Sequence, residues 1–202
     1  MLSIVKEEIG LAKAALIEAD IEAAERCIAN DKQVDDLMDE LEQRILTVIA
    51  RRQPAASDLR FLGATYRTLA DIERAGDYAV HVARAGAKLA ASPPIKKYND
   101  LKHILDILET MTETTIHALA DSSEAKAREA HHMDKSVDDL YEQIQRELLS
   151  YMIEKPELIS TGTELLSVAR NLERLGDHLE NVNEHIVFWL TSERLEGHHL
   201  EG

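Results

Sequence analysis

The chain contains two copies of one sequence pattern, and this repeat constrains its fold more than any other feature. The segment DKQVDDL at residues 31–37 returns as DKSVDDL at residues 134–140, at an offset of 103 residues. The segment ERAGD at residues 73–77 returns as ERLGD at residues 173–177, at an offset of 100 residues. The length difference falls in the connection between the two motifs, which reads as a loop because it contains a proline in each half.

Each copy is predicted to form three helices. Ala and Leu dominate the composition and only 4% of the residues are aromatic, which favours helices over strands. In the second predicted helix, apolar residues such as Val34, Leu41 and Ile45 keep a spacing of three or four positions, as in an amphipathic helix. The six predicted helices cover residues 2–19, 21–52, 57–91, 97–120, 124–154 and 162–192.

Polar residues predict where several of these helices begin. Asp20 and Ser123 occupy equivalent repeat positions and are candidate N-caps. Ser57 is a candidate N-cap for the third helix, and Thr161 with Glu164 forms a candidate capping box for the sixth. We therefore expect an all-α protein of two pseudo-symmetric three-helix bundles that share a face. The bundles would span residues 1–92 and 95–192, followed by a disordered tail at residues 193–202.

The charge of the chain excludes several classes of partner. Acidic residues outnumber basic ones by 38 to 23, and the formal net charge is −15. Nucleic-acid binding needs basic stripes that neutralise phosphates, and only the isolated pair Lys96 and Lys97 stands out. The single Cys27 lies in an apolar stripe, which predicts a buried thiol in a reducing compartment. We expect no nucleic-acid partner, no direct lipid binding and no membrane span.

Acidic residues recur four positions apart at corresponding places in both copies. Positions at this spacing lie on one face of a helix, one turn above each other. The pairs flank the apolar direction of their helices, so they would meet where two helices pack. A half-buried carboxylate cluster has to be protonated, paired with arginine or neutralised by a cation. The candidate metal ligands are Asp35, Asp39, Glu73, Asp77, Asp138, Glu142, Glu173 and Asp177.

A glycine lies between the two acids of each ERxGD motif. A mid-helix glycine costs about 1 kcal/mol relative to alanine, so Gly76 and Gly176 predict that a neighbouring helix or a bound ion approaches the backbone. Arg74 and Arg174 offer a competing explanation for the acids, because both could pair with them. If a metal is bound, the oxygen-rich ligand set suits Mg, Ca, Mn or ferric iron, with Zn also possible.

Histidines provide weaker candidates. His131 and His132 follow a Glu-x-x-His spacing that di-iron enzymes use twice on core helices, but the second copy here lies only in the C-terminal tail. We expect both histidines to be exposed. His81 and Asn181 are equivalent in the repeat, and either could complete a metal shell or lie on the surface. We recognise no Gly-rich phosphate loop and no nucleophile elbow.

The two motifs in tandem resemble the signatures of the PhoU family. The segments DIERAGDYA at residues 71–79 and NLERLGDH at residues 171–178 resemble the first and second signatures. The segment RRQPAASDLR at residues 51–60 resembles the family's sequence between its second and third helices. The resemblance covers nearly the whole chain and implies two three-helix bundles. It also implies that the acids of the E/D-x-x-x-D motifs, the eight candidates above, bind multinuclear clusters of iron, zinc, manganese or magnesium.

The resemblance further implies a role and partners. It implies a negative regulator of phosphate uptake and of the phosphate-starvation response, located in the cytoplasm at the inner face of the membrane. Such a protein links the ATPase subunit of the phosphate ABC transporter to the sensor histidine kinase, and often forms a homodimer. His81 and Glu142 depart from the family pattern, which leaves the metal and the equivalence of the two sites open.

A non-enzymatic adaptor is therefore the expected function, and two alternatives remain. One is a PhoU-like paralogue that serves another transporter. The other is a carboxylate-bridged metalloenzyme, which the shortage of histidine ligands near the acids disfavours.

Overall fold

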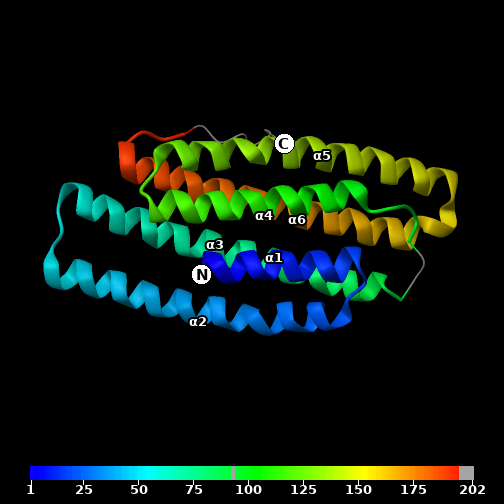
Figure 1. The fold of residues 1–202 in the computed structure, drawn as a ribbon, viewed down its shortest axis with the longest axis horizontal. Coiled ribbons are helices and arrows are strands. Elements are labelled where there is room, and N and C mark those ends of the chain that lie inside the picture. Colours follow the sequence, from blue (N-terminus) through cyan, green and yellow to red (C-terminus); the bar gives the residue numbers. More distant parts are fainter. Residues whose placement is uncertain (92–93, 196–202) are drawn as a thin grey trace.

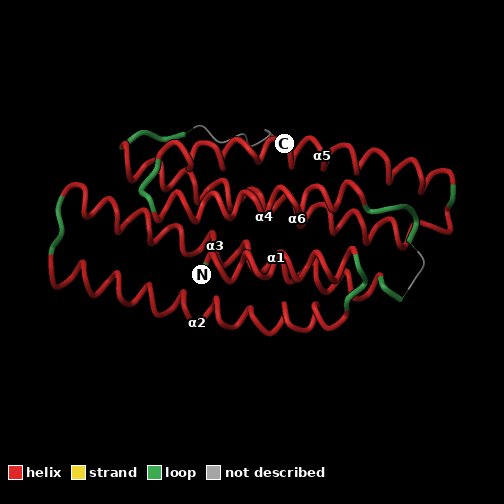
Figure 2. The backbone as a smooth tube through the Cα atoms, in the orientation of Figure 1, coloured by secondary structure: helices red, strands yellow, loops and turns green. Residues whose placement is uncertain are grey.

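The structure is a computed structural model that describes residues 1–91 and 94–195, and the regular structure in these ranges is entirely helical (Figure 1, Figure 2). The all-α class and the two repeated halves are therefore confirmed. Parts of the predicted break between the halves (residues 92–93) and of the predicted tail (residues 196–202) lie outside the described residues. The elements are α1 (Leu2–Ile17), α2 (Ile21–Arg52), α3 (Ala56–Leu89), α4 (Asn99–Ala120), α5 (Glu124–Glu154), the 3-10 turn η1 (Pro156–Leu158) and α6 (Ile159–Thr191).

The helices α2 and α5 begin at the residues that their predicted caps indicate. The Asp20 side chain accepts a hydrogen bond from the Ala23 N–H at 3.0 Å. The Ser123 hydroxyl accepts one from the Lys126 N–H at 3.4 Å. Each cap satisfies a backbone donor that the start of a helix leaves without an intrahelical partner. Both predictions are confirmed.

Two other predicted caps are wrong. In α3 the Ala55 carbonyl already accepts the Asp58 N–H at 3.2 Å, so Ser57 lies inside the first turn. The 3-10 turn η1 leads directly into α6, so Thr161 and its predicted partner Glu164 lie within that helix rather than at its start. In both places a backbone turn after a proline begins the helix before the polar residue is reached.

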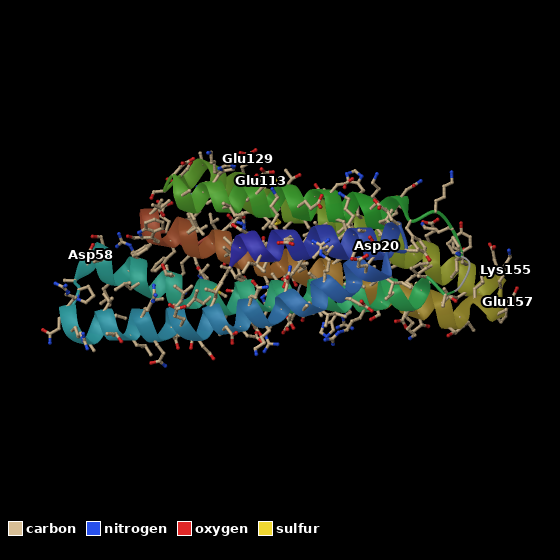
Figure 3. All side chains as sticks on the ribbon, turned by 60° about the horizontal axis from the view of Figure 1, so that its bottom comes forward. Asp20, Asp58, Glu113, Glu129, Lys155 and Glu157 are labelled. Carbon is tan, nitrogen blue, oxygen red and sulfur yellow. The ribbon has the colours of Figure 1, made fainter. Side chains whose placement is uncertain are left out.

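The six helices run along the long axis of an elongated molecule (Figure 1). The helices α3 and α6 pack together in the middle, and α2 and α5 lie at opposite outer edges. The α2–α3 turn and the α5–α6 connection lie at opposite ends of the molecule, as the pseudo-symmetry of the repeat requires. Charged side chains cover the outside, for example Asp58 near one end and Lys155 and Glu157 at the other (Figure 3).

Repeat-equivalent residues meet where α3 and α6 join the two halves. The rings of Tyr78 and His178 stack with centroids 5.7 Å apart and planes inclined by 22°. Beside them, Asp71 pairs with His178 Nδ1 at 2.9 Å and with His185 Nε2 at 3.2 Å. Burial alone would raise the pKa of Asp71, but the hydrogen bonds with the two histidines lower it to about 2. A polar cluster therefore ties the halves together.

One apolar core runs through both halves. It takes buried side chains from all six helices, among them Ile9, Ile72, Leu105 and Leu172. Cys27 belongs to this core, which confirms the predicted buried thiol, and burial raises its pKa to about 12. Within the described residues, no helix combines the length and the apolar character that crossing a membrane requires.

Candidate metal centre

Acidic side chains of α5 and α6 converge in the second half, and we name this group the second acidic seam. Ligand atoms of Asp134, Asp138 and Asp177 lie within 4.8 Å of one another. Burial raises the pKa of Glu173, and the negative charges of Asp177 and Asp138 raise it further. The second acidic seam consists of Asp134, Asp138, Glu173 and Asp177.

The first half has a corresponding group, the first acidic seam, which is more open. Burial and the charge of Asp77 raise the pKa of both Asp31 and Glu73. The Asp77 side chain is 31% exposed, against 14% for its equivalent Asp177. Among the described residues, no three ligand atoms of this seam lie within 4.8 Å of one another. The first acidic seam consists of Glu8 of α1, Asp31 and Asp35 of α2, and Glu73 and Asp77 of α3. Asp35 is exposed, but its charge raises the pKa of Glu8 and of Glu73.

A buried carboxylate lies against each of the two mid-helix glycines. A Cβ atom at Gly76 would lie 3.0 Å from Glu8 Oε2, and one at Gly176 would lie 2.3 Å from Asp134 Oδ1. An alanine side chain would therefore press on the acid at the first position and displace it at the second. The expected close approach to the backbone is confirmed, and the approaching group is a carboxylate from a neighbouring helix.

These two buried carboxylates are not repeat equivalents. At the offset of 103 residues, Glu8 corresponds to Met111, which is fully buried and apolar. Asp134 corresponds to Asp31, which is only partly buried. The same position beside the glycine is thus filled from α1 in the first half and from α5 in the second.

Both buried acids are destabilised in their ionised form. Burial, followed by repulsion from Asp31 and Asp77, raises the pKa of Glu8 to about 8. Burial, followed by repulsion from Asp138, raises the pKa of Asp134 to about 9. Within the described part of the chain, the two carboxylate oxygens of Glu8 have no hydrogen-bond partner, and Asp134 Oδ1 also has none. An unsatisfied buried polar group costs about 1–3 kcal/mol, which a cation between the acids would offset. The residues present therefore fit a bound metal ion.

One arginine beside each seam neutralises part of its charge. Arg74 lies 3.6 Å from Glu73 and donates to Asp77 at 3.2 Å. Arg174 is placed in the same way against the two acids of its own motif, at 3.4 and 3.1 Å. The competing explanation from the sequence is therefore correct for these motif acids. Arg84 also lowers the pKa of Asp31, and Arg170 lowers that of Glu173. The carboxylates still outnumber these guanidinium groups, so an excess of negative charge remains in each seam.

Two of the predicted ligands lie apart from the converging groups, and three residues of these groups were not predicted. Glu142 is exposed and pairs with Arg146 at 3.2 Å, and Asp39 is also exposed. In turn, sequence reasoning missed Glu8, Asp31 and Asp134. Asp31 and Asp134 open the two copies of the repeated DKxVDDL motif, which was a usable signal. The signal for Glu8 was weaker, because its repeat counterpart is not acidic.

The weaker polar candidates differ in their burial. His131 is only 3% exposed, so the expectation of exposure is wrong for it, because its face of α5 packs towards α6. His132 is exposed, as predicted. His81 lies on the surface, whereas the Asn181 amide donates to Asp71 at 3.3 Å and belongs to the contact between the halves.

Comparison with known proteins gives consistent matches over both halves. The family model described as the PhoU domain matches residues 1–86 and again residues 101–186. The phosphate-specific transport system accessory protein PhoU homolog of Deinococcus radiodurans is 42% identical over 194 residues, which cover 96% of this chain and 91% of that protein. PhoU homolog 1 of Methanothermobacter thermautotrophicus is 36% identical and covers 91% of this chain and 84% of that protein.

Solved structures agree with these matches. The crystal structure of PhoU from Pseudomonas aeruginosa superposes with a TM-score of 0.92 at 32% identity, covering 96% of this chain and 93% of that chain. The phosphate transport system regulatory protein PhoU from Streptococcus pneumoniae superposes with a TM-score of 0.88 at 26% identity, covering 96% and 92%. These relatives are named as regulatory or accessory proteins and not as enzymes, in agreement with the expectation of a non-enzymatic role. The chain therefore belongs to the PhoU family of phosphate transport regulatory proteins.

Proposed function

We propose that this protein is a negative regulator of phosphate uptake and of the phosphate-starvation response. It acts in the cytoplasm, at the inner face of the membrane, as an adaptor between the ATPase subunit of the phosphate ABC transporter and the sensor histidine kinase. The observation that carries this proposal is the match of the PhoU domain to both halves of the chain. The names of its relatives, accessory and regulatory proteins of phosphate transport, support the link to that transport system.

Metal ions in the two acidic seams would be structural parts of this adaptor. Asp138 and Asp177 would hold an ion together with Asp134 in the second seam, and the acids of the first seam would act in the same way around Glu8. A bound cation would supply positive charge that links α2 to α3 and α5 to α6, and it would make the outer faces less negative. Oxygen ligands suit magnesium, manganese or ferric iron, and they also accept zinc.

Exposed apolar side chains at the two ends of the molecule support docking to other proteins. Leu46 and Leu59 are exposed near the α2–α3 turn. Their repeat equivalents, Leu149 and Ile159, are exposed near the α5–α6 connection. Contiguous apolar surface that a protein leaves exposed often marks a site of protein interaction. We propose that these two ends contact the transporter and the kinase, and that the protein forms a homodimer.

Deletion of the gene, followed by complementation, tests the proposed function. Loss of the protein should raise phosphate uptake and release the starvation response, as measured by labelled phosphate and a reporter gene. Complementation with Leu46→Glu/Leu59→Glu or with Leu149→Glu/Ile159→Glu should fail and should abolish co-purification of one partner, because a charge in an apolar contact opposes docking. The change Glu113→Gln, at an exposed site on α4, serves as the control. Unchanged phosphate control after deletion would contradict the proposal, and co-purification of another transporter's ATPase would favour the paralogue alternative.

A further inference from the structure

A group of metal-ligand side chains lies one helical turn beyond the second acidic seam. His131 of α5 faces Glu180 and Glu184 of α6, and one ligand atom from each residue lies within 4.8 Å of the others. His131 Nδ1 is 3.3 Å from Glu180 Oε1. These two side chains are 3% and 1% exposed and Glu184 is half-buried, so the group differs from the solvated ion pairs of the surface.

The first half of the chain shows that the fold does not require polar residues at these positions. The repeat equivalent of Glu180 is Val80, which is buried to nearly the same extent. An apolar side chain can therefore fill this place between two packed helices. Burying an ionised carboxylate is expensive unless its charge is compensated, so the second half carries a polar group for which packing gives no reason. The equivalents of the three residues in the first half are Ile28, Val80 and Arg84.

One distance within the group matches the spacing of two ligands on one ion. Two ligands at about 2.1 Å from a tetrahedral metal lie about 3.4 Å apart, and the His131–Glu180 distance is 3.3 Å. An imidazole nitrogen favours zinc and other divalent transition metals over magnesium and calcium, whereas the acidic seams offer only oxygen. We propose that His131, Glu180 and Glu184 form a binding site for a divalent transition metal such as zinc, distinct from the two acidic seams.

Such an ion would join α5 to α6 through side chains from both helices. It would also act on the neighbouring seam, because the charge of Glu180 is among those that raise the pKa of Asp134. A divalent cation at His131 offsets part of that repulsion. The first half has no counterpart of this arrangement, since its equivalent positions carry Ile28, Val80 and Arg84.

Zinc analysis of the full-length chain tests the proposal. The protein is stripped with a chelator, loaded with zinc in the presence of excess magnesium, dialysed, and analysed for zinc per chain. The variant His131→Ile/Glu180→Val/Glu184→Arg installs the residues that occupy the equivalent positions of the first half, where Val80 is buried and Ile28 and Arg84 are exposed. It should hold one zinc fewer than the natural protein. The exposed neighbour supplies the matched control, because His132→Ala should lose none. Equal zinc content in the natural protein and the triple variant would overturn the proposal.

A second measurement does not depend on the folding of any variant. In the natural protein, zinc should shift the nitrogen NMR signals of the His131 ring, and magnesium should leave them unchanged. The shift should persist in Asp138→Asn/Asp177→Asn, which alters only the second acidic seam. A His131 signal that zinc does not move would show that the histidine only pairs with Glu180, and the metal site would be rejected.

Discussion

The two acidic seams carry the same repeated motifs, yet different helices complete them. In the first half a buried acid comes from α1, as Glu8, and in the second it comes from α5, as Asp134. The second seam is less exposed and brings three ligand atoms within 4.8 Å of one another. Charges interact more strongly where less water screens them, and a preformed site needs less ordering on binding. We therefore expect the second seam to bind a cation more tightly than the first.

The largest expected effect comes from replacing a buried acid with its amide. In metal-free protein at neutral pH, folding has to protonate Asp134, so Asp134→Asn should raise the free energy of unfolding by an amount on the order of 3 kcal/mol. Glu8→Gln should raise it by less, because the pKa of Glu8 is raised less. Denaturant unfolding with a chelator present measures both values. Each variant should also lose metal affinity in its own seam, and a loss of stability in both would contradict the account of the buried acids.

The pH dependence of stability follows from the same two acids. The pKa of Asp134 is 3.8 in its ordinary state and about 9 in the folded protein, so between these values the folded state binds more protons than the unfolded state. Stability should therefore fall as pH rises through this range. Saturating manganese should reduce the slope, because a metal-bound carboxylate is already ionised. Thermal melts with and without manganese measure this, and metal-free stability that rises with pH would contradict it.

The two glycines should differ by a smaller amount. Gly176→Ala places a Cβ atom 2.3 Å from Asp134 Oδ1, and it should cost about 1–2 kcal/mol, as overpacking of a core does. Gly76→Ala meets Glu8 only at 3.0 Å, and the gain in helix propensity of about 1 kcal/mol should offset that contact. The double variant Gly176→Ala/Asp134→Ala should recover most of the loss. Equal free energies of unfolding for the two single variants would contradict the closer contact that the structure gives to Gly176.

The smallest effects are expected at the two predicted ligands that lie apart from the seams. Asp39→Asn and Glu142→Gln change exposed side chains, so stability should change by less than about 0.5 kcal/mol. The metal content per chain should remain that of the natural protein. If either variant loses metal, that residue is a metal ligand, and the eight acids predicted from spacing would be the better assignment of the sites.

The sequence predicted the helices well because they depend on local periodicity, and the role of the motif acids as metal ligands stays a prediction from the same local spacing. It placed the first residues of α2 and α5 from Asp20 and Ser123, whose caps act within one turn. Spacing alone could not decide which acids converge. Asp134 and Asp138 are four positions apart, and so are Asp138 and Glu142. Glu8 was missed because its role depends on how α1 packs against α3, which is a long-range contact.

The burial of His131 was missed for a related reason. Its repeat equivalent, Ile28, is exposed, so the repeat itself gave no indication that this face of α5 is covered. Burial at such a position depends on how closely two helices pack, and side-chain periodicity within one helix does not specify that distance.

Crystals grown with manganese, with diffraction data collected at the manganese absorption edge, test the central claim most directly. The account predicts anomalous peaks in both seams, with the stronger peak in contact with Asp134, Asp138 and Asp177. A weaker peak should lie beside Glu8 and Asp77. Data without a peak in either seam, in which Arg74 and Arg174 alone balance the motif acids, would contradict it.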